Sequence, residues 1–345
     1  MQEHSFRNLR KQAVGQLLNQ LLAVPNSGSV DLDSLKDSIR VLVCRPVPSL
    51  GNMLGLTPLI TEINRTFPKA KIDIAVSSSV SESIYKNLPG VDSIFTFPIK
   101  GLRHPVKIMR SYFSLRQSRY DLVINPVNSN SGRILAKLAH GDHYLIALDD
   151  LLLDKQEHFA KSQVCFFRNA LQCCTADNDA SIPNLELALD EDERDNGKKI
   201  LNVLMAGDEP KRTISMFTNA TGDKCYSASW WRRLYDLLMD KVGDVNFIEI
   251  LPIHGEAKLS GLMPGYHSQD IREVAALIAA TDLFIGADSG IMHLASAAGT
   301  PTVGLFNVTP IEVWRPYGTV DMAIDTKCGS EEWVAHQIVE HFSKL

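Results

Sequence analysis

From residue 39 onward, short apolar runs alternate with longer stretches whose hydrophobic positions recur at helical spacing. Proline and glycine punctuate these stretches, as Pro68 and Pro89-Gly90 do. The first series predicts these elements: strands over 39–44, 71–76, 93–97, 120–125, 143–148 and 183–189, and helices over 52–66, 79–88, 132–140 and 160–176. Alternation of this kind predicts a parallel sheet covered by helices on both faces.

A second series follows a charged stretch at 190–199, which we expect to be a solvated segment near a domain boundary. It predicts strands over 213–220, 245–251, 282–287 and 302–306, and helices over 229–242, 270–280 and 291–298. The fold class is therefore α/β, with two doubly wound domains over 37–205 and 206–345. The last helix is free to cross back to the first domain. Ligands of such sheets bind beyond the carboxyl ends of the strands, so we expect the site in the cleft between the domains.

Residues 1–36 are predicted to be an extra N-terminal amphipathic helix and a linker. Leucines and valines recur at helical spacing over 6–24, and basic residues cluster at the start of that stretch. The favoured interpretation is a helix that packs on the protein or on a partner subunit. The alternative is peripheral attachment to the anionic cytoplasmic face of an inner membrane.

Composition narrows the class of protein. A net charge of −5 argues against bulk affinity for nucleic acid. The six cysteines form no CxxC pair and have no histidine at metal-binding spacing, which indicates reduced thiols in the cytoplasm. No apolar run approaches the roughly 20 residues that span a bilayer, and the N-terminus lacks the features of a secretory signal. We therefore expect a cytoplasmic protein.

The segment 282–306 carries the clearest chemical pattern. An apolar strand ends at a loop with Asp288, Ser289 and Gly290, and His293 follows one helical turn later. Free N–H groups at a helix start, small residues and an imidazole suit a bound diphosphate. The alternative is that Asp288 or Ser289 only caps the helix while His293 is a core residue. A serine hydrolase is disfavoured, because the serine stands one position late for a GxSxG turn.

The stretch "DSGIMHLASAAGTPTVGLFNVTPIEVWRPYG" (288–318) resembles the signature of glycosyltransferase family 9, the family of the ADP-heptose:lipopolysaccharide heptosyltransferases. The segments "RPVPSLGNMLGLTPLITEINRTFPKAKIDIAV" and "YDLVINPVNSNSGRILAKLAHG" are similar to the opening and middle of the same family. The resemblance covers roughly residues 39–320 and implies the GT-B fold, in which two Rossmann-like domains face a central cleft.

The resemblance implies a role for each matching residue. Asp288, Gly290 and His293 contact the diphosphate and sugar of the donor, with Ser289 beside them, and Lys224 takes the place of the donor-phosphate lysine. The loop that carries Lys224 offers further donor-binding groups, namely Thr218, Asn219 and Thr221. Glu256 or Glu249 holds the ribose hydroxyls, since a carboxylate accepts two hydroxyl hydrogen bonds. We take Glu256 as the first choice.

The residue after Gly51 departs from the family. Relatives have an aspartate there, taken as the general base that removes the proton of the acceptor hydroxyl, and this chain has Asn52. An amide orients an acceptor by hydrogen bonds but does not take its proton. Either another group is the base, or the protein is a slow or inactive member, or its chemistry differs. Asn125 likewise stands where many relatives have an aspartate.

A basic stretch at 100–121 contrasts with the acidic chain. The common interpretation is a solvated helix face. In the family the corresponding region lies on the acceptor side, which implies that Arg103, Lys107 and Arg110 bind an anionic glycan together with Gly51 and Asn52.

We therefore predict an inverting glycosyltransferase that moves a sugar from a nucleotide diphosphate donor to a lipopolysaccharide or related glycan. Heptose and ADP come from the resemblance. Asn52, Lys224 and His293 are the candidate catalytic residues. No cofactor and no metal is expected, and the nucleotide sugar is a substrate. The alternatives are a non-catalytic nucleotide-sugar-binding relative, suggested by Asn52, and an epimerase or hydrolase on the same fold.

Overall fold

The structure is a computed structural model and describes these parts of the chain: Val30, Leu35 and residues 38–78, 80–97, 105–148, 157–171, 181–206 and 211–345. The helix predicted over 6–24 lies outside them. No helix in the described part of the chain is long and apolar enough to cross a membrane.

The first domain is built on a parallel sheet of order β3-β2-β1-β4-β5. Its strands are β1 (Arg40–Cys44), β2 (Lys71–Val76), β3 (Val91–Thr96), β4 (Arg119–Asn125) and β5 (His140–Ile146). Its helices are α2 (Leu50–Leu54), α3 (Thr57–Thr66), α4 (Val80–Tyr85), α5 (Pro105–Gln117), α6 (Asn130–Leu138) and α7 (Lys161–Ala170). The chain winds outward from β1 and returns to place β4 on its other side, so the strand order reverses between β1 and β4.

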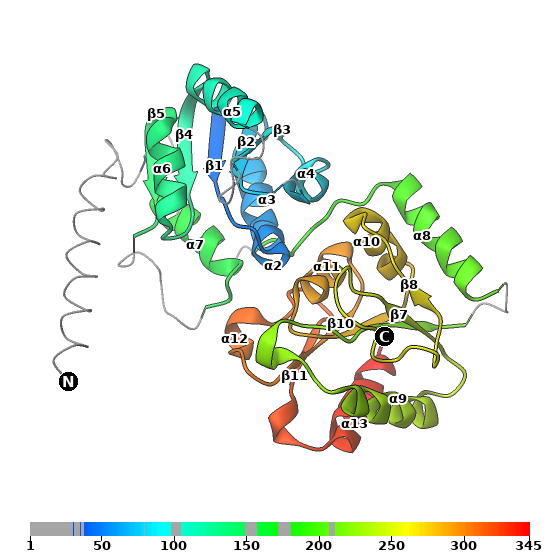
Figure 1. Cartoon of the computed structure of the whole chain (residues 1–345). Helices are drawn as coiled ribbons and strands as arrows, with labels where there is room; N and C mark the ends of the chain where they lie inside the picture. Colours follow the sequence, from blue (N-terminus) through cyan, green and yellow to red (C-terminus); the bar gives the residue numbers. More distant parts are fainter. Residues whose placement is uncertain are drawn as a thin grey trace.

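The second sheet is also parallel and has the order β11-β10-β9-β6-β7-β8. Its strands are β6 (Thr213–Phe217), β7 (Asn246–Ile250), β8 (Gly265–Tyr266), β9 (Leu283–Ala287), β10 (Thr302–Phe306) and β11 (Met322–Asp325). Its helices include α9 (Ala228–Val242), α10 (Ile271–Ala279), α11 (Gly290–Ala298), α12 (Ile311–Trp314) and α13 (Glu331–Phe342). Here the order reverses between β6 and β9. The predicted pair of doubly wound units is confirmed (Figure 1).

The helix predicted over 52–66 is two helices, α2 and α3. Pro58 lies in the first turn of α3, where its missing N–H removes no helical bond, and Thr57 Oγ1 donates to the carbonyl of Leu54 at 2.8 Å. Gly55 lies between the helices against Phe159, where an added Cβ would be 2.0 Å from the ring. The break directs α2 towards the second domain (Figure 1).

Near the boundary, the predicted strand at 183–189 is wrong, while the charged stretch at 190–199 is mostly exposed, as predicted, and is helical. Residues 183–189 are extended but pair with no strand of the described structure. Their alternate residues are buried and pack on the core that the two domains share. The charged stretch at 190–199 forms a helix, α8 (Glu191–Leu204), with a capping box between Asp190 and Glu193. Gly197 brings α8 against α10: an added Cβ would be 2.0 Å from the carbonyl oxygen of Ala276. By its packing, α8 therefore belongs with the second sheet, although we expected it in the domain over 37–205.

The last helix does not carry its buried face to the first domain. Val334, Ala335, Ile338 and Phe342 of α13 are buried in the cluster between α9 and the second sheet. A contact between the two domains is made instead by the side chain of Arg272 in α10. Its buried guanidinium donates to the carbonyl of Ser83 in α4 at 2.8 Å, to those of Leu187 and Ala188 at 3.1 Å, and to Glu193.

Candidate active site

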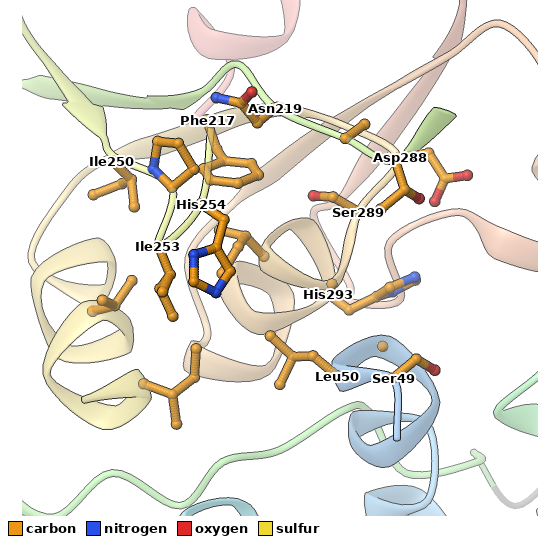
Figure 2. A pocket seen from close by; sticks show the side chains of 18 of the residues that line it. Ser49, Leu50, Phe217, Asn219, Ile250, Ile253, His254, Asp288, Ser289 and His293 are labelled. Atoms are coloured by element: carbon orange, nitrogen blue, oxygen red, sulfur yellow. The ribbon is translucent and has the colours of Figure 1, made fainter. Parts of the chain in front are cut away.

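A cavity of about 670 Å³ lies where the two domains meet. Residues 49–52, at the start of α2, line one side, and most of the lining comes from loops at the carboxyl ends of β6, β7 and β9. Figure 2 shows Asp288 and Ser289 at one end of the cavity and Phe217 and Ile250 at the other. The strand-end rule therefore places the cavity at the point where the order of the second sheet reverses.

Lys224 and Asp288 form the charged end of the cavity. Lys224 ends a short 3₁₀ turn after β6, and its Nζ lies 3.2 Å from Oδ2 of Asp288. The same carboxylate oxygen accepts a hydrogen bond from the hydroxyl of Thr309, and the Asp288 side chain is nearly fully buried. The pair is neutral as a unit, while the ammonium keeps N–H donors for a further anion.

The first turn of α11 faces the same space. Ser289 is the N-cap, and its Oγ accepts from the backbone N–H of Met292 at 3.3 Å. The first amides of a helix have no intrahelical acceptor, and Ser289, Gly290 and Ile291 all line the cavity. Their N–H groups and the helix dipole suit a negatively charged ligand at this end.

His293 is enclosed at the seam of the two domains. Its ring packs edge-on against Phe159, with ring centroids 5.0 Å apart. An added Cβ at Gly51 would lie 2.8 Å from Cδ2 of His293, so only glycine allows α2 to come this close. Nδ1 has no hydrogen-bond partner within the described structure. Burial, with minor effects of His158 and Lys224, lowers the pKa of His293 to about 3, so the imidazole is neutral at physiological pH.

The first domain presents Asn52 to the cavity. Its Nδ2 donates to Oγ of Ser49 at 2.7 Å, and its Oδ1 accepts from Nη2 of Arg45 at 3.3 Å. Asp288 is the only carboxylate that lines the cavity among the described residues, and it is already paired with Lys224. Within the described part of the chain, no group of three or more His, Cys, Asp or Glu side chains is arranged to hold a metal ion.

The structure brings most of the predicted site residues to the cavity. They are Gly51, Asn52, Asn219, Thr221, Lys224, Asp288, Ser289, Gly290 and His293. Thr218 is not among them: it is buried, and its hydroxyl donates to Oε1 of Glu249 at 2.7 Å.

Neither glutamate proposed for the ribose lines the cavity. Glu249 is buried and accepts from the backbone N–H groups of Lys258 and Leu259, so it holds the loop after β7 in place. Glu256 is exposed, and its backbone carbonyl accepts from Nδ2 of Asn219 at 3.0 Å. Glu249 therefore has a structural role and Glu256 is exposed to solvent, and neither lines the cavity.

The basic stretch lies apart from the cavity where the structure describes it. Arg110 is exposed on α5 and is not one of the lining residues. Arg103 and the side chain of Lys107 lie outside the described part of the chain.

Sequence reasoning missed the apolar end of the cavity. Phe217 and Ile250 are the last residues of β6 and β7, and Ile253, His254 and Val274 extend the same wall (Figure 2). The sequence could have indicated Phe217 and Ile250, because ligands of such sheets bind beyond the carboxyl ends of the strands and these residues end β6 and β7. An apolar wall beside an anion-binding end matches a nucleotide, whose flat base is joined to a diphosphate.

Comparison with known proteins identifies the family. The family model described as "Glycosyltransferase family 9 (heptosyltransferase)" matches residues 108–341. The chain belongs to glycosyltransferase family 9. It is therefore a glycosyltransferase, and the predicted enzyme class is confirmed.

Individual relatives are distant in sequence and similar in fold. "Lipopolysaccharide heptosyltransferase 3" of Escherichia coli is 22% identical over an alignment of 314 positions that covers 77% of this chain and 83% of the relative. The family 9 glycosyl transferase of Veillonella parvula superposes with a TM-score of 0.73 at 15% identity, covering 93% of this chain and all of that one. The E. coli heptosyltransferase WaaC with ADP gives a TM-score of 0.66 at 18% identity, covering 88% and 100%. These structures share the two-domain GT-B fold with this family 9 chain.

Proposed function

We propose that this family 9 glycosyltransferase transfers heptose from ADP-heptose to an anionic acceptor of the lipopolysaccharide core, with inversion at the anomeric carbon. One observation carries the proposal: the cavity joins an apolar wall at Phe217 and Ile250 to an anion-binding end at Lys224 and the first turn of α11. Two related structures, at TM-scores of 0.66 and 0.63, hold ADP and ADP-2-deoxy-2-fluoro heptose. The acceptor class is supported by the relatives named lipopolysaccharide heptosyltransferase 3.

In this proposal the donor lies in the second domain. The adenine packs on the apolar wall, and the diphosphate lies between Lys224 and the amides of Gly290 and Ile291. The acceptor hydroxyl attacks the anomeric carbon from the side of α2 as the bond to the diphosphate breaks. Lys224 and the helix start stabilise the negative charge that develops on the leaving ADP. The proton of the acceptor hydroxyl leaves through solvent, since Asn52 is no base.

We propose that His293 binds the donor and transfers no proton. Its pKa of about 3 keeps the ring neutral, and a neutral imidazole offers one N–H donor and one acceptor. The positive charge at the donor site therefore comes from Lys224 and the helix dipole. We propose that these groups supply the leaving-group stabilisation without a metal ion, so transfer continues in the presence of EDTA.

Donor binding tests the proposal most directly. Melting temperatures are measured with ADP, GDP and UDP and with the corresponding nucleotide heptoses, because a ligand that binds the native state raises the melting temperature. We expect ADP and ADP-heptose to stabilise the protein and Lys224→Met to remove most of the shift. Equal stabilisation by all three nucleotides would contradict the adenine assignment. The anomeric configuration of the transferred sugar, read by NMR, tests inversion.

The proposed place of action is the cytoplasmic face of the inner membrane. The basic amphipathic stretch over 6–24 supports this location. Co-sedimentation of the full chain with anionic and with zwitterionic vesicles tests it. Binding that requires anionic lipid is the expected result, and no binding to either would contradict it.

A further inference from the structure

Arg45 is a buried cation next to the reacting position. It directly follows β1 and is 8% exposed. Its Nη2 donates to Oδ1 of Asn52 at 3.3 Å, and its Nε has no hydrogen-bond partner in the described structure. A guanidinium has five N–H donors, so one amide oxygen satisfies only a small part of this group.

Two other arginines with little exposure have a carboxylate partner, whereas the buried Arg133 donates to Oδ1 of Asn128. Arg168 pairs with Glu62 and Arg272 with Glu193. None of the ion pairs between described residues includes Arg45. Burial lowers the pKa of Arg45, because desolvation disfavours its charged form. A buried charge is normally paired, and Arg45 has no anionic partner among the described residues.

The same edge of the first sheet holds a second buried donor without a hydrogen-bond partner. The parallel register puts Val43 opposite Ile124, so Arg45 and Asn125 emerge at the same edge of the sheet, where its strand order reverses. Asn125 is fully buried, and its Nδ2 has no hydrogen-bond partner. Its Oδ1 lies 3.5 Å from the hydroxyl of Ser129, the N-cap of α6. Two independent orphan donors therefore lie at the point where such a sheet binds its ligand.

We propose that Arg45 binds an acidic group of the acceptor, a carboxylate or a phosphate, beside the hydroxyl that attacks the donor. Asn52 keeps this place open, because an amide leaves the charge of Arg45 uncompensated. An aspartate at position 52 would lie at ion-pair distance and take that charge itself. The planar guanidinium binds either oxyanion through two parallel hydrogen bonds. This assignment rests on the proposed function, since it names the acceptor group of the same site.

Anion binding is tested on the whole protein in a phosphate-free buffer at constant ionic strength. ADP is first added to saturation, so that the donor site is occupied. Inorganic phosphate and acetate are then titrated separately while the melting temperature is recorded. We expect a saturable rise with at least one of the two anions. The anion that acts distinguishes a phosphate from a carboxylate on the acceptor.

Three variants assign the effect. Arg45→Met and Asn52→Asp are expected to abolish the rise, and Arg45→Lys to weaken it, because lysine keeps the charge without the fork. Arg65→Met is the matched control: it removes an exposed arginine at the far end of α3 and is expected to respond as wild type does. Asn52→Asp also carries the test if Arg45→Met does not fold, which circular dichroism decides.

The outcomes separate the two proposals. No saturable rise with either anion, or an equal rise in wild type and Arg45→Met, overturns the role of Arg45. A failure of ADP to bind contradicts the proposed function instead. The anion titration is then repeated in Lys224→Met, which lacks the donor-site cation, so a rise that depends on Arg45 would still support the anion site.

Discussion

The two sheets have the same winding, yet the points where their strand order reverses carry opposite electrostatics. Beyond β6 and β9, Lys224 and Asp288 pair at 3.2 Å, and the cavity opens beside them. Beyond β1 and β4, the buried Arg45 donates to Asn52, and no ion pair of the described residues includes it. The cation of the second sheet, Lys224, has a carboxylate partner within the chain, whereas the cation of the first sheet, Arg45, has none among the described residues.

This difference teaches how one topology serves two kinds of ligand. In our proposal, the Lys224–Asp288 pair holds the ammonium in place before the diphosphate of the donor binds, so little reorganisation is needed on binding. At the acceptor end, the cation is fixed by burial and by Asn52. Its charge remains available to a substrate. Each of the following experiments changes the charge on one side of this comparison.

The largest effect is expected from Lys224→Met. Without the ammonium, the charge on the leaving diphosphate loses its main stabilising group, and kcat falls by about 10²–10³-fold. The variant also leaves Asp288 buried without its cation, which costs about 1–3 kcal/mol of folding stability. Steady-state kinetics and urea unfolding measure the two effects.

The double variant Lys224→Met/Asp288→Asn is the control for Lys224→Met. It is expected to recover stability but not activity, because it removes the unpaired charge without restoring a cation. Arg45→Met, in contrast, is expected to cost little stability in the ligand-free protein, since it leaves no buried acid behind. An unchanged kcat in Lys224→Met would contradict the donor-site assignment.

Asn52→Asp makes the acceptor end resemble the donor end. The new carboxylate lies next to Nη2 of Arg45, now 3.3 Å from the amide oxygen, and competes with the acceptor. We expect the KM for the acceptor to rise about 10-fold, the loss of one charge-assisted contact, while the KM for the donor stays unchanged. A gain in transfer rate instead would show that position 52 acts as a base when it is acidic and that Asn52 slows the natural enzyme.

His293 lies at the seam between the two regions, and its burial predicts a pH dependence. The pKa is about 3 in the folded protein and 6.5 as the reference for the unfolded chain, so the unfolded state binds more protons between these values. The free energy of unfolding therefore decreases as pH falls through this window. His293→Gln removes this titrating group. Between pH 7 and pH 5, the free energy of unfolding of the variant should therefore fall by about 2 kcal/mol less than that of wild type. His336→Gln, an exposed histidine of α13, should match wild type in the same urea titrations.

The smallest effect is expected from reversing charge on the basic stretch. Arg103, Lys107 and Arg110 changed together to glutamate should raise the KM for the acceptor about two- to fivefold and weaken its dependence on salt, because the sequence predicts a solvated helix face, where each charge contributes little. The KM for the donor should stay the same. An effect larger than that of Asn52→Asp would move the main anion contact from Arg45 to this stretch.

The arrangement of residues at one end of the cavity was predictable from sequence because it is local. Asp288, Ser289, Gly290 and His293 lie within two turns of one another at the end of an apolar strand. Their functional interpretation needed only the strand, the cap and the helix spacing. Lys224 was predicted from the family resemblance, and its approach to Asp288 across β6 and β9 is a tertiary contact that no local pattern encodes.

The remaining errors have the same physical origin. Thr218 and Glu249 are among the predicted ligand-binding groups, but the Thr218 hydroxyl donates to the Glu249 carboxylate across neighbouring strands. The stretch at 190–199 is mostly exposed, as its charge predicts, but its charge does not reveal that Glu193 pairs with the buried Arg272 or that Gly197 lets α8 lie against α10. The sequence shows that Arg45 follows a buried strand. Only the three-dimensional structure shows that Arg45 forms no ion pair with a described residue.

Arg272 has one more consequence, which concerns how the molecule unfolds. Its guanidinium is bonded to α4 of the first domain, to the crossing segment and to α8, while its backbone belongs to the second domain. Separating the domains would break the bond of Arg272 to Ser83 and uncover the apolar cluster that both sheets share. The two domains therefore lose their structure together, as one cooperative unit, and calorimetry of the ligand-free chain should record a single heat-absorption peak.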